Sequence, residues 1–162
     1  MKKLLRVLKY ALVLAAGVIA GAVGMMKIKN KDLDRVSKKV NKFRSYYNVL
    51  NQWMMLKNNG VPLKQYFEDN GYQSLAIYGM GEIGNRLYEE LKDTDIKVEY
   101  AIDQSAGSAF AALTVYGLED ELQPVDVIVV TAVFAFDEIE DELCGKTDIP
   151  VISLEEIVFG LK

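Results

Sequence analysis

Three glycines lie close together in the stretch GMGEIG, which runs from Gly79 to Gly84. An apolar segment, Ser74 to Tyr78, precedes it, and an amphipathic segment that reaches Leu91 follows it. A strand, a G-x-G-x-x-G turn and a helix in this order form the phosphate-binding corner of dinucleotide-binding folds. The first glycine permits the tight turn, the second lets backbone N–H groups approach a pyrophosphate, and the third lets the helix pack on the strand. We therefore expect a nucleotide to lie against the residues of this turn, which are Gly79, Met80, Gly81, Glu82, Ile83 and Gly84.

A carboxylate follows the next predicted strand. The segment IKVEYAID ends at Asp103, 19 residues beyond Gly84, where such units place the acid that hydrogen-bonds a ribose hydroxyl. No arginine occurs in the following QSAGSAF, so nothing there would neutralise a 2′-phosphate, and we expect NAD rather than NADP. The alternative is that Asp103 only caps the end of its strand.

Two further residues bear on the ligand. Glu82 would repel a diphosphate by like charge, an effect that Arg86, one helical turn later, could offset. A nucleotide sugar is therefore an alternative to NAD as the expected ligand. Thr131 follows the apolar segment Val125 to Val130, so it lies in a loop on the expected ligand side of the sheet.

Groups that perform catalysis are scarce. The chain has no histidine, which excludes histidine triads and histidine metal sites. After Gly60 the Tyr-x-x-x-Lys spacing, the usual proton donor of nucleotide-sugar enzymes, occurs once, at Tyr88 and Lys92 in the segment that follows the glycine turn. Cys144, the single cysteine, stands among acidic residues that disfavour a thiolate. We expect no catalytic residues and no metal, so an enzyme is the less favoured interpretation; the alternative is a minimal nucleotide-sugar epimerase or dehydrogenase.

The elements that must position these residues form a small α/β domain. Strands are predicted at 74–78, 96–103, 113–116, 125–130 and 150–152, with helices between them. Nearly continuous apolar runs such as VDVIVV are typical of buried parallel strands. We predict a small Rossmann-like doubly wound parallel sheet over residues 61–162, preceded by a transmembrane helix and a connecting helix.

Charge divides the chain. Residues 1–59 carry thirteen Lys and Arg against two acids, a net charge of +11, whereas residues 60–162 have a net charge of −15. The acidic part should repel nucleic acid, because phosphate binding needs Lys and Arg. The basic part adjoins an apolar run, an arrangement that suits anionic lipid.

That apolar run, residues 10–26, reads YALVLAAGVIAGAVGMM and would be about 25 Å long as a helix, the short end for a membrane span. We predict an anchor over residues 1–28, in contact with lipid through residues 4–28. Eight basic residues follow the run closely and four precede it, so the positive-inside rule places the C-terminal domain in the cytoplasm of a single-pass protein of the cytoplasmic membrane. The alternative is a cleaved signal peptide with Ala20-Gly21-Ala22 as its cleavage site.

A basic amphipathic helix is predicted over residues 29–60, with a break from the anchor at Lys29-Asn30-Lys31. Apolar residues recur there at spacings of 3 and 4 over three heptads, an apolar seam that could join two copies. Its members are Leu33, Val36, Val40, Phe43, Tyr47, Leu50 and Met54. Gly17 and Gly21 form a small-residue face that could also bring two helices together. The alternative is that the aromatic end (Tyr46, Tyr47, Trp53 and Met54) packs on the following domain.

Four stretches carry a family likeness: NQWMMLKNNG, YFEDNGYQSLAIYGMGEIGNRLYEEL, YAIDQSA and VDVIVVTAVFAFDEIEDEL. On them, the chain from about Lys42 to Val158 resembles the small Rossmann-like modules attached to enzymes of bacterial cell-surface polysaccharide synthesis. Those modules stand beside glycosyltransferase-like and acyltransferase domains and look like sites for nucleotides or nucleotide sugars. The resemblance implies ligand-side roles for Gly79, Gly81, Gly84 and Asp103, and also for Thr131. This sequence departs from the pattern because its module adjoins a predicted membrane anchor where those modules adjoin a catalytic domain.

These observations lead to one expected function and two alternatives. We expect a membrane-tethered accessory or regulatory module that binds NAD or a nucleotide sugar and works with a polysaccharide-synthesis enzyme. The first alternative is a structural docking module whose glycine turn is vestigial. The second is the minimal epimerase or dehydrogenase named above.

Overall fold

The computed structural model describes residues 2–103 and 113–161 of the 162-residue chain. In the first helix, side chains are described for Gly17, Met25, Met26, Lys29 and every residue from Lys31 onward. The chain divides into two units, Met1–Phe43 and Arg44–Lys162. The second unit contains the sheet and all the residues predicted to bind a ligand.

Helix α1 (Lys2–Asn58) is continuous through residues 29–31. The predicted break at Lys29-Asn30-Lys31 is therefore wrong. No glycine or proline occurs between Lys27 and Asn59, and Lys or Asn within a helix costs only a fraction of a kcal/mol, roughly 0.7 at most. Gly60, with a φ of 75°, follows the end of the helix, where a glycine in this conformation commonly stops a helix.

The apolar run of the predicted anchor, residues 10–26, falls almost wholly on positions whose side chains lie outside the described set, and so does Gly21 of the small-residue face. Within the part of the chain that is described, no helix is apolar over a sufficient length to span a membrane. The anchor therefore stays a prediction.

The second unit is built on a five-stranded parallel sheet. Its strands are β1 (Ser74–Tyr78), β2 (Lys97–Ile102), β3 (Val115–Tyr116), β4 (Val127–Val130) and β5 (Val151–Ser153). Their order is β3-β2-β1-β4-β5, and all four pairings are parallel. This confirms the predicted α/β fold with a Rossmann-like parallel sheet.

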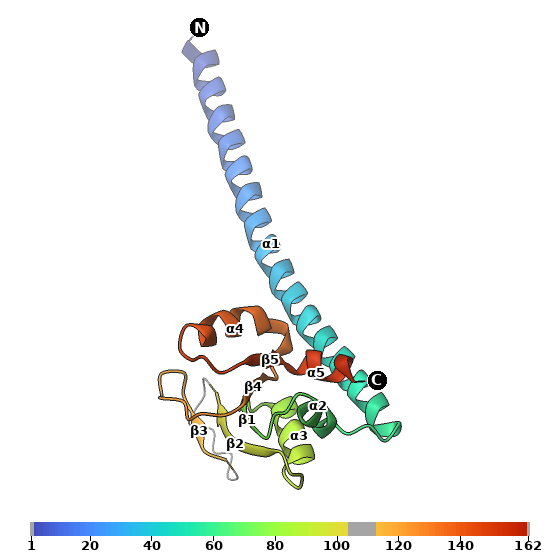
Figure 1. The fold of residues 1–162 in the computed structure, drawn as a ribbon. Helices are drawn as coiled ribbons and strands as arrows, with labels where there is room; N and C mark the ends of the chain where they lie inside the picture. The colour runs from blue at the N-terminus through green and yellow to red at the C-terminus, as the bar shows by residue number, and fades with distance from the viewer. Residues whose placement is uncertain (1, 104–112, 162) are drawn as a thin grey trace. The chain divides into compact units, whose positions relative to one another are not determined.

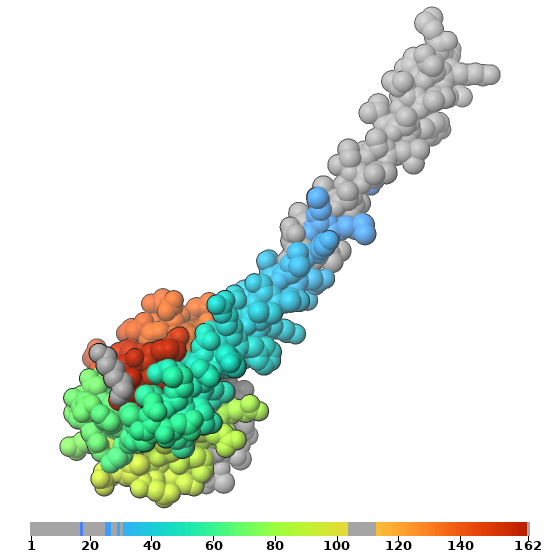
Figure 2. Space-filling view, turned by 90° about the vertical axis from the view of Figure 1, so that its right-hand side faces the viewer, coloured from blue at the N-terminus to red at the C-terminus, as the bar shows by residue number. Residues whose placement is uncertain are grey.

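Helices cover both faces of the sheet, as Figure 1 shows. On one face, α2 (Lys64–Asp69), α3 (Glu82–Leu91), α5 (Leu154–Gly160) and the C-terminal end of α1 form a core with β1 and β4. Figure 2 shows α5 at the surface beside this end of α1. On the other face, α4 (Phe136–Cys144) packs on β1, β2 and β4. The four residues of β4 are fully buried, which explains their continuous apolar sequence.

The strand order places a topological switch point at the centre of the sheet. The chain moves from β1 to β2 on one side and later to β4 on the other side of β1. Connections therefore diverge at the C-terminal ends of β1 and β4, and ligands of open α/β sheets bind where they do so.

Candidate functional site at the C-terminal edge of the sheet

The glycine turn follows β1 directly, at the centre of this edge. Gly79 has a φ of +93°, a backbone conformation that side chains other than glycine rarely adopt. Its N–H donates to the carbonyl oxygen of Ile102 at 2.8 Å, so the turn begins while the chain is still paired with β2. A Cβ on Gly79 would lie 3.0 Å from the hydroxyl oxygen of Thr131. Both its conformation and its neighbours thus require glycine here.

Gly84 brings α3 close to the turn. A Cβ at this position would lie 2.1 Å from the carbonyl oxygen of Gly79 and 3.4 Å from Cγ2 of Ile77. Since real Cβ atoms do not approach backbone so closely, the third glycine serves helix–strand packing.

Gly81 is different, because no described heavy atom lies within 4 Å of the position of its Cβ. It is the N-cap residue of α3, with extended backbone (φ −73°, ψ −164°), and among the described residues no side chain caps the helix. The positive end of the helix dipole therefore lies beside an open side of the turn. Asn85 stabilises the turn from within the helix by donating from Nδ2 to the carbonyl oxygen of Met80 at 3.3 Å.

Asp103 lies at the end of β2, next to the turn. Its Oδ2 accepts the backbone N–H of Met80 at 2.9 Å. Its own N–H donates to the carbonyl oxygen of Tyr116 at 3.0 Å, so the backbone of Asp103 is held by the adjacent strand β3. The structure thus brings the predicted acid and the predicted turn into direct contact.

Thr131 holds the turn from the other side. It follows β4, is buried, and donates its hydroxyl to the carbonyl oxygens of Gly79 at 2.7 Å and Tyr78 at 3.1 Å. Its backbone N–H also donates to the carbonyl oxygen of Tyr78, at 3.0 Å. In this geometry Thr131 positions the turn, and its only hydroxyl proton is directed to the backbone.

The remaining three predicted residues lie differently. The side chain of Ile83 is buried in the core, so only its backbone is available on this edge. Met80 is half-buried and packs against the same core. Glu82 is exposed in the first turn of α3, where its charge is favourable to the helix dipole. Gly79, Met80, Asp103 and Thr131 are therefore the predicted residues that hydrogen bonds join.

Glu90 is a positioning residue that sequence reasoning missed. Its side chain, 13% exposed, ion-pairs with Lys57 at 3.3 Å. It also accepts from the indole N–H of Trp53 at 2.9 Å and the backbone N–H of Leu63 at 3.1 Å. One carboxylate thereby ties α3 to the end of α1 and to the start of α2. The only signal in the sequence is its place beside Leu91, on the flank of the apolar face of α3.

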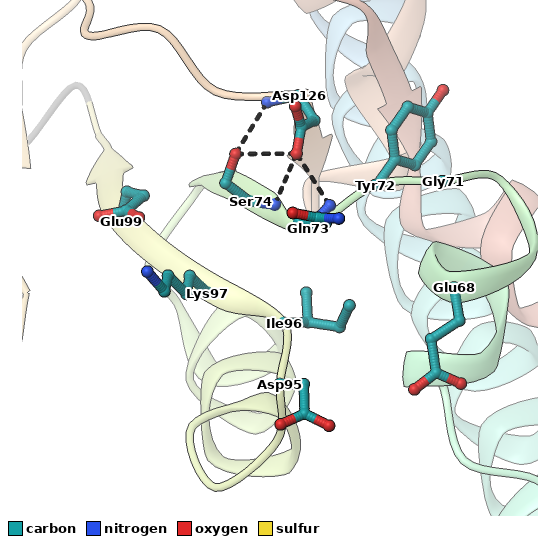
Figure 3. Close-up of a pocket in the computed structure, with 10 residues that line it drawn as sticks. All are labelled: Glu68, Gly71, Tyr72, Gln73, Ser74, Asp95, Ile96, Lys97, Glu99 and Asp126. Atoms are coloured by element: carbon teal, nitrogen blue, oxygen red, sulfur yellow. Dashed lines mark hydrogen bonds between the residues drawn. The ribbon is translucent and has the colours of Figure 1, made fainter.

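Asp126 is the second missed residue, and it lies at the opposite edge of the sheet. Its Oδ2 accepts the backbone N–H groups of Gln73 at 2.8 Å and Ser74 at 2.7 Å, and the Ser74 hydroxyl at 3.0 Å. These bonds, that from Gln73 first, lower the pKa of Asp126. The carboxylate joins the start of β4 to the start of β1, as Figure 3 shows.

Asp126 is one of the residues that line an open pocket of about 670 Å³ at this edge (Figure 3). Its lining includes Glu68, Asp95 and Glu99, opposed by Lys97. No group of His, Cys, Asp or Glu in the described residues is arranged to hold a metal ion. The pocket lies where the strands begin, away from the edge at which such folds bind ligands, and Asp126 has a structural role in it.

The described residues form a small five-stranded parallel α/β domain with a glycine turn at its switch point. Comparisons of the chain with protein-family models, with curated proteins and with solved structures find no match.

Proposed function

We propose that this chain is a membrane-tethered nucleotide-binding module that assists or regulates an enzyme of bacterial cell-surface polysaccharide synthesis. The observation that carries the binding is the open side of Gly81 above the uncapped N-terminus of α3. A phosphate group needs such a place, where backbone N–H groups and the helix dipole point at it and no Cβ intervenes. The setting in polysaccharide synthesis rests on the family resemblance described above.

The residues around Gly81 fit the diphosphate and ribose that NAD and nucleotide sugars share. Asp103 stands on the adjacent strand, within hydrogen-bond distance of the turn, where it can accept from a ribose hydroxyl. No arginine occurs in residues 104–110 to pair with a 2′-phosphate, which favours NAD over NADP. Arg86 is exposed one helical turn beyond Glu82 and offsets its charge.

An accessory role suits these residues better than catalysis does. The chain has no histidine, and Thr131 uses its hydroxyl on the turn itself. A bound nucleotide would therefore signal the level of the cofactor or the sugar nucleotide, and the chain's own residues would hold it.

Thermal unfolding of the full chain in mild detergent tests the binding. The panel is NAD, NADH, NADP, S-adenosylmethionine and several nucleotide sugars. A ligand at 100 times its dissociation constant adds about 2.7 kcal/mol, a shift of several °C for a unit of this size. If no member of the panel raises the unfolding temperature of a well-folded sample, the proposal fails.

Gly81→Asp separates binding from folding. Its extended backbone suits an N-cap residue, so the new carboxylate should cap α3 and leave the domain as stable as before or more so. The same carboxylate would occupy the open side of the turn and repel a phosphate, which should abolish the ligand-induced shift. Gly81→Asn is the matched control, because it caps the helix without charge: loss of binding in both variants would indicate steric exclusion, and loss only in Gly81→Asp would indicate charge. An unchanged ligand-induced shift in both variants would place the ligand elsewhere.

One observation favours the alternative of a docking module with an empty turn. The N–H of Met80 is already hydrogen-bonded to Asp103, so the chain itself satisfies a donor of the turn. A panel without a hit would make this alternative the working interpretation.

The tether is tested by reporters fused after Lys162. A fluorescent protein that matures in the cytoplasm should be active and alkaline phosphatase should be inactive, with both found in the membrane fraction. Phosphatase activity together with a mature N-terminus near Ala22 would instead show the cleaved signal peptide.

A further inference from the structure

Helix α1 presents two different apolar faces, and the domain of the same chain covers one of them. Within the second unit, Val49, Trp53 and Leu56 are buried in the core. Tyr46 is half-buried, and its ring meets that of Phe134 edge to face at a centroid distance of 5.6 Å. The prediction that the aromatic end packs on the domain is therefore correct for Trp53 and Tyr46.

The other face is the apolar seam predicted from the sequence. In the second unit, Tyr47, Leu50 and Met54 are exposed by 68%, 41% and 59%, so their own domain does not cover them. The packing prediction is therefore wrong for Tyr47 and Met54. In the first unit, the seam residues are also exposed, by 56% to 71%: Leu33, Val36, Val40 and Phe43. The spacing of 3 and 4 continues without a skip through all seven residues.

We propose that the partner of this seam is the seam of a second copy of the chain, in a parallel, in-register two-stranded coiled coil. Apolar residues repeated in heptads along one helix interlock with the same repeat on a second helix, and they do not interlock with a flat or irregular surface. The parallel orientation rests on the proposed tether, because two anchors in one membrane require it.

A hollow on α1 supports a helix as the occupant. It is bounded by Lys29, Asp32, Leu33 and Val36, together with Met25. The first four have the spacing i, i+3, i+4 and i+7, which is the arrangement of four residues that encloses an inserted side chain in coiled coils.

The area also suits a dimer. Each apolar side chain of this size has roughly 60–120 Å² of surface to bury. Fourteen of them, partly covered already, amount to on the order of 1,000 Å², about the lower limit for a specific interface.

The charged residues that flank the seam predict how the dimer responds to salt. In a parallel pair, Lys39 of one chain lies next to Arg44 of the other, at positions g and e of the heptad, and these like charges repel. The dimer should therefore tighten as salt screens them.

Light scattering on the full chain in mild detergent measures the mass of the protein part. The expected value is twice 18.2 kDa, with a dimer fraction that rises with salt. Val40→Glu with Tyr47→Glu, two seam positions seven residues apart, should return the mass to that of one chain. The matched control is Asn41→Glu with Asn48→Glu, which adds the same charge at the same spacing on exposed positions outside the seam and should leave the dimer intact.

A monomeric native chain, or a dimer that survives the seam variant, would overturn the proposal. All four positions are exposed, so unchanged fluorescence of Trp53 verifies that the domain is folded in each variant. Orientation is tested in a Cys144→Ser background by Val40→Cys, which should form a disulfide between chains upon oxidation, whereas Lys38→Cys should not. A dimer without the Val40→Cys crosslink would refute the parallel register and the tether argument for it while leaving nucleotide binding unaffected.

Discussion

The three glycines of the turn, Gly79, Gly81 and Gly84, have three different structural roles, and replacing each of them by alanine tells these roles apart. The perturbation is the same methyl group each time. Its nearest neighbour is the backbone oxygen of Gly79 at 2.1 Å for Gly84, and the hydroxyl of Thr131 at 3.0 Å for Gly79. For Gly81 no described atom lies within 4 Å.

The magnitudes follow from these distances. At Gly84 the contact is with backbone, so α3 must move away from β1, and the cost should reach or exceed about 3 kcal/mol, the upper end for overpacking. At Gly79 the positive φ costs about 1–3 kcal/mol, to which the displaced Thr131 hydroxyl adds. At Gly81 the extended backbone accepts alanine, and the weaker N-cap costs at most about 1 kcal/mol.

Trp53 provides the assay, because it is the single tryptophan and is buried in the core of the second unit. Urea unfolding of the full chain, followed by its fluorescence, should rank the variants Gly84→Ala, Gly79→Ala and Gly81→Ala from least to most stable. Only Gly81→Ala should stay within about 1 kcal/mol of the native stability while losing affinity for a nucleotide. If Gly84→Ala proves as stable as Gly81→Ala, the close packing of α3 on the turn is wrong, and with it the geometry on which the site depends.

Three further predictions concern carboxylates. Asp103→Asn keeps an acceptor for the N–H of Met80 but removes the charge, so the fold should hold while the preference for NAD over NADP narrows in binding assays; an unchanged preference would exclude Asp103 from ribose recognition. Glu90→Gln replaces one of the two accepting oxygens by an N–H donor, so at least one of the three donors loses its acceptor, and the free energy of unfolding measured in urea should fall by about 1–3 kcal/mol; a loss below about 0.5 kcal/mol would mean that these bonds do not tie the helices together. Asp126 has a pKa below its ordinary value in the folded state, so as pH falls the unfolded chain takes up the proton first. Its stabilisation is full above about pH 4 and is lost below it, and the stability difference between the native chain and Asp126→Asn should shrink in acid; a difference independent of pH would refute this role.

Much of the fold was predictable because its signals are local. The strand before Gly79 has the predicted bounds. A run of apolar residues in β4 and the spacing from Gly84 to Asp103 suffice to predict parallel strands whose ends meet at one edge. The break at Asn30 was predicted because the glycine face of the anchor does not continue in phase into the seam. That prediction is wrong, since two faces of one continuous helix can differ in phase and no glycine or proline interrupts the chain there.

The packing partner of an individual side chain could not be predicted in the same way, because residues of one type pack against different partners. Trp53 and Met54 are neighbours in the sequence and both are apolar, yet one is buried against the domain and the other is exposed on the seam. Glu90 lies on the flank of an amphipathic helix, where acids are usually solvated, and its three donors come from segments 27 to 37 residues away. Only tertiary packing determines these choices.

The hydrogen bond between Asp103 and Met80 shows why this matters for the ligand. The sequence predicts that Asp103 accepts a hydrogen bond from a ribose hydroxyl. In the structure, its Oδ2 already accepts the backbone N–H of Met80 in the glycine turn. A ribose that displaced this bond would leave the Met80 N–H unpaired, at a cost of about 1–3 kcal/mol, unless a ligand oxygen replaced the carboxylate. A diphosphate can supply that oxygen, because its own place is beside the same turn. A nucleoside without phosphates cannot, so adenosine should bind much more weakly than NAD, and equal affinities would mean that the Asp103 bond stays closed in the complex.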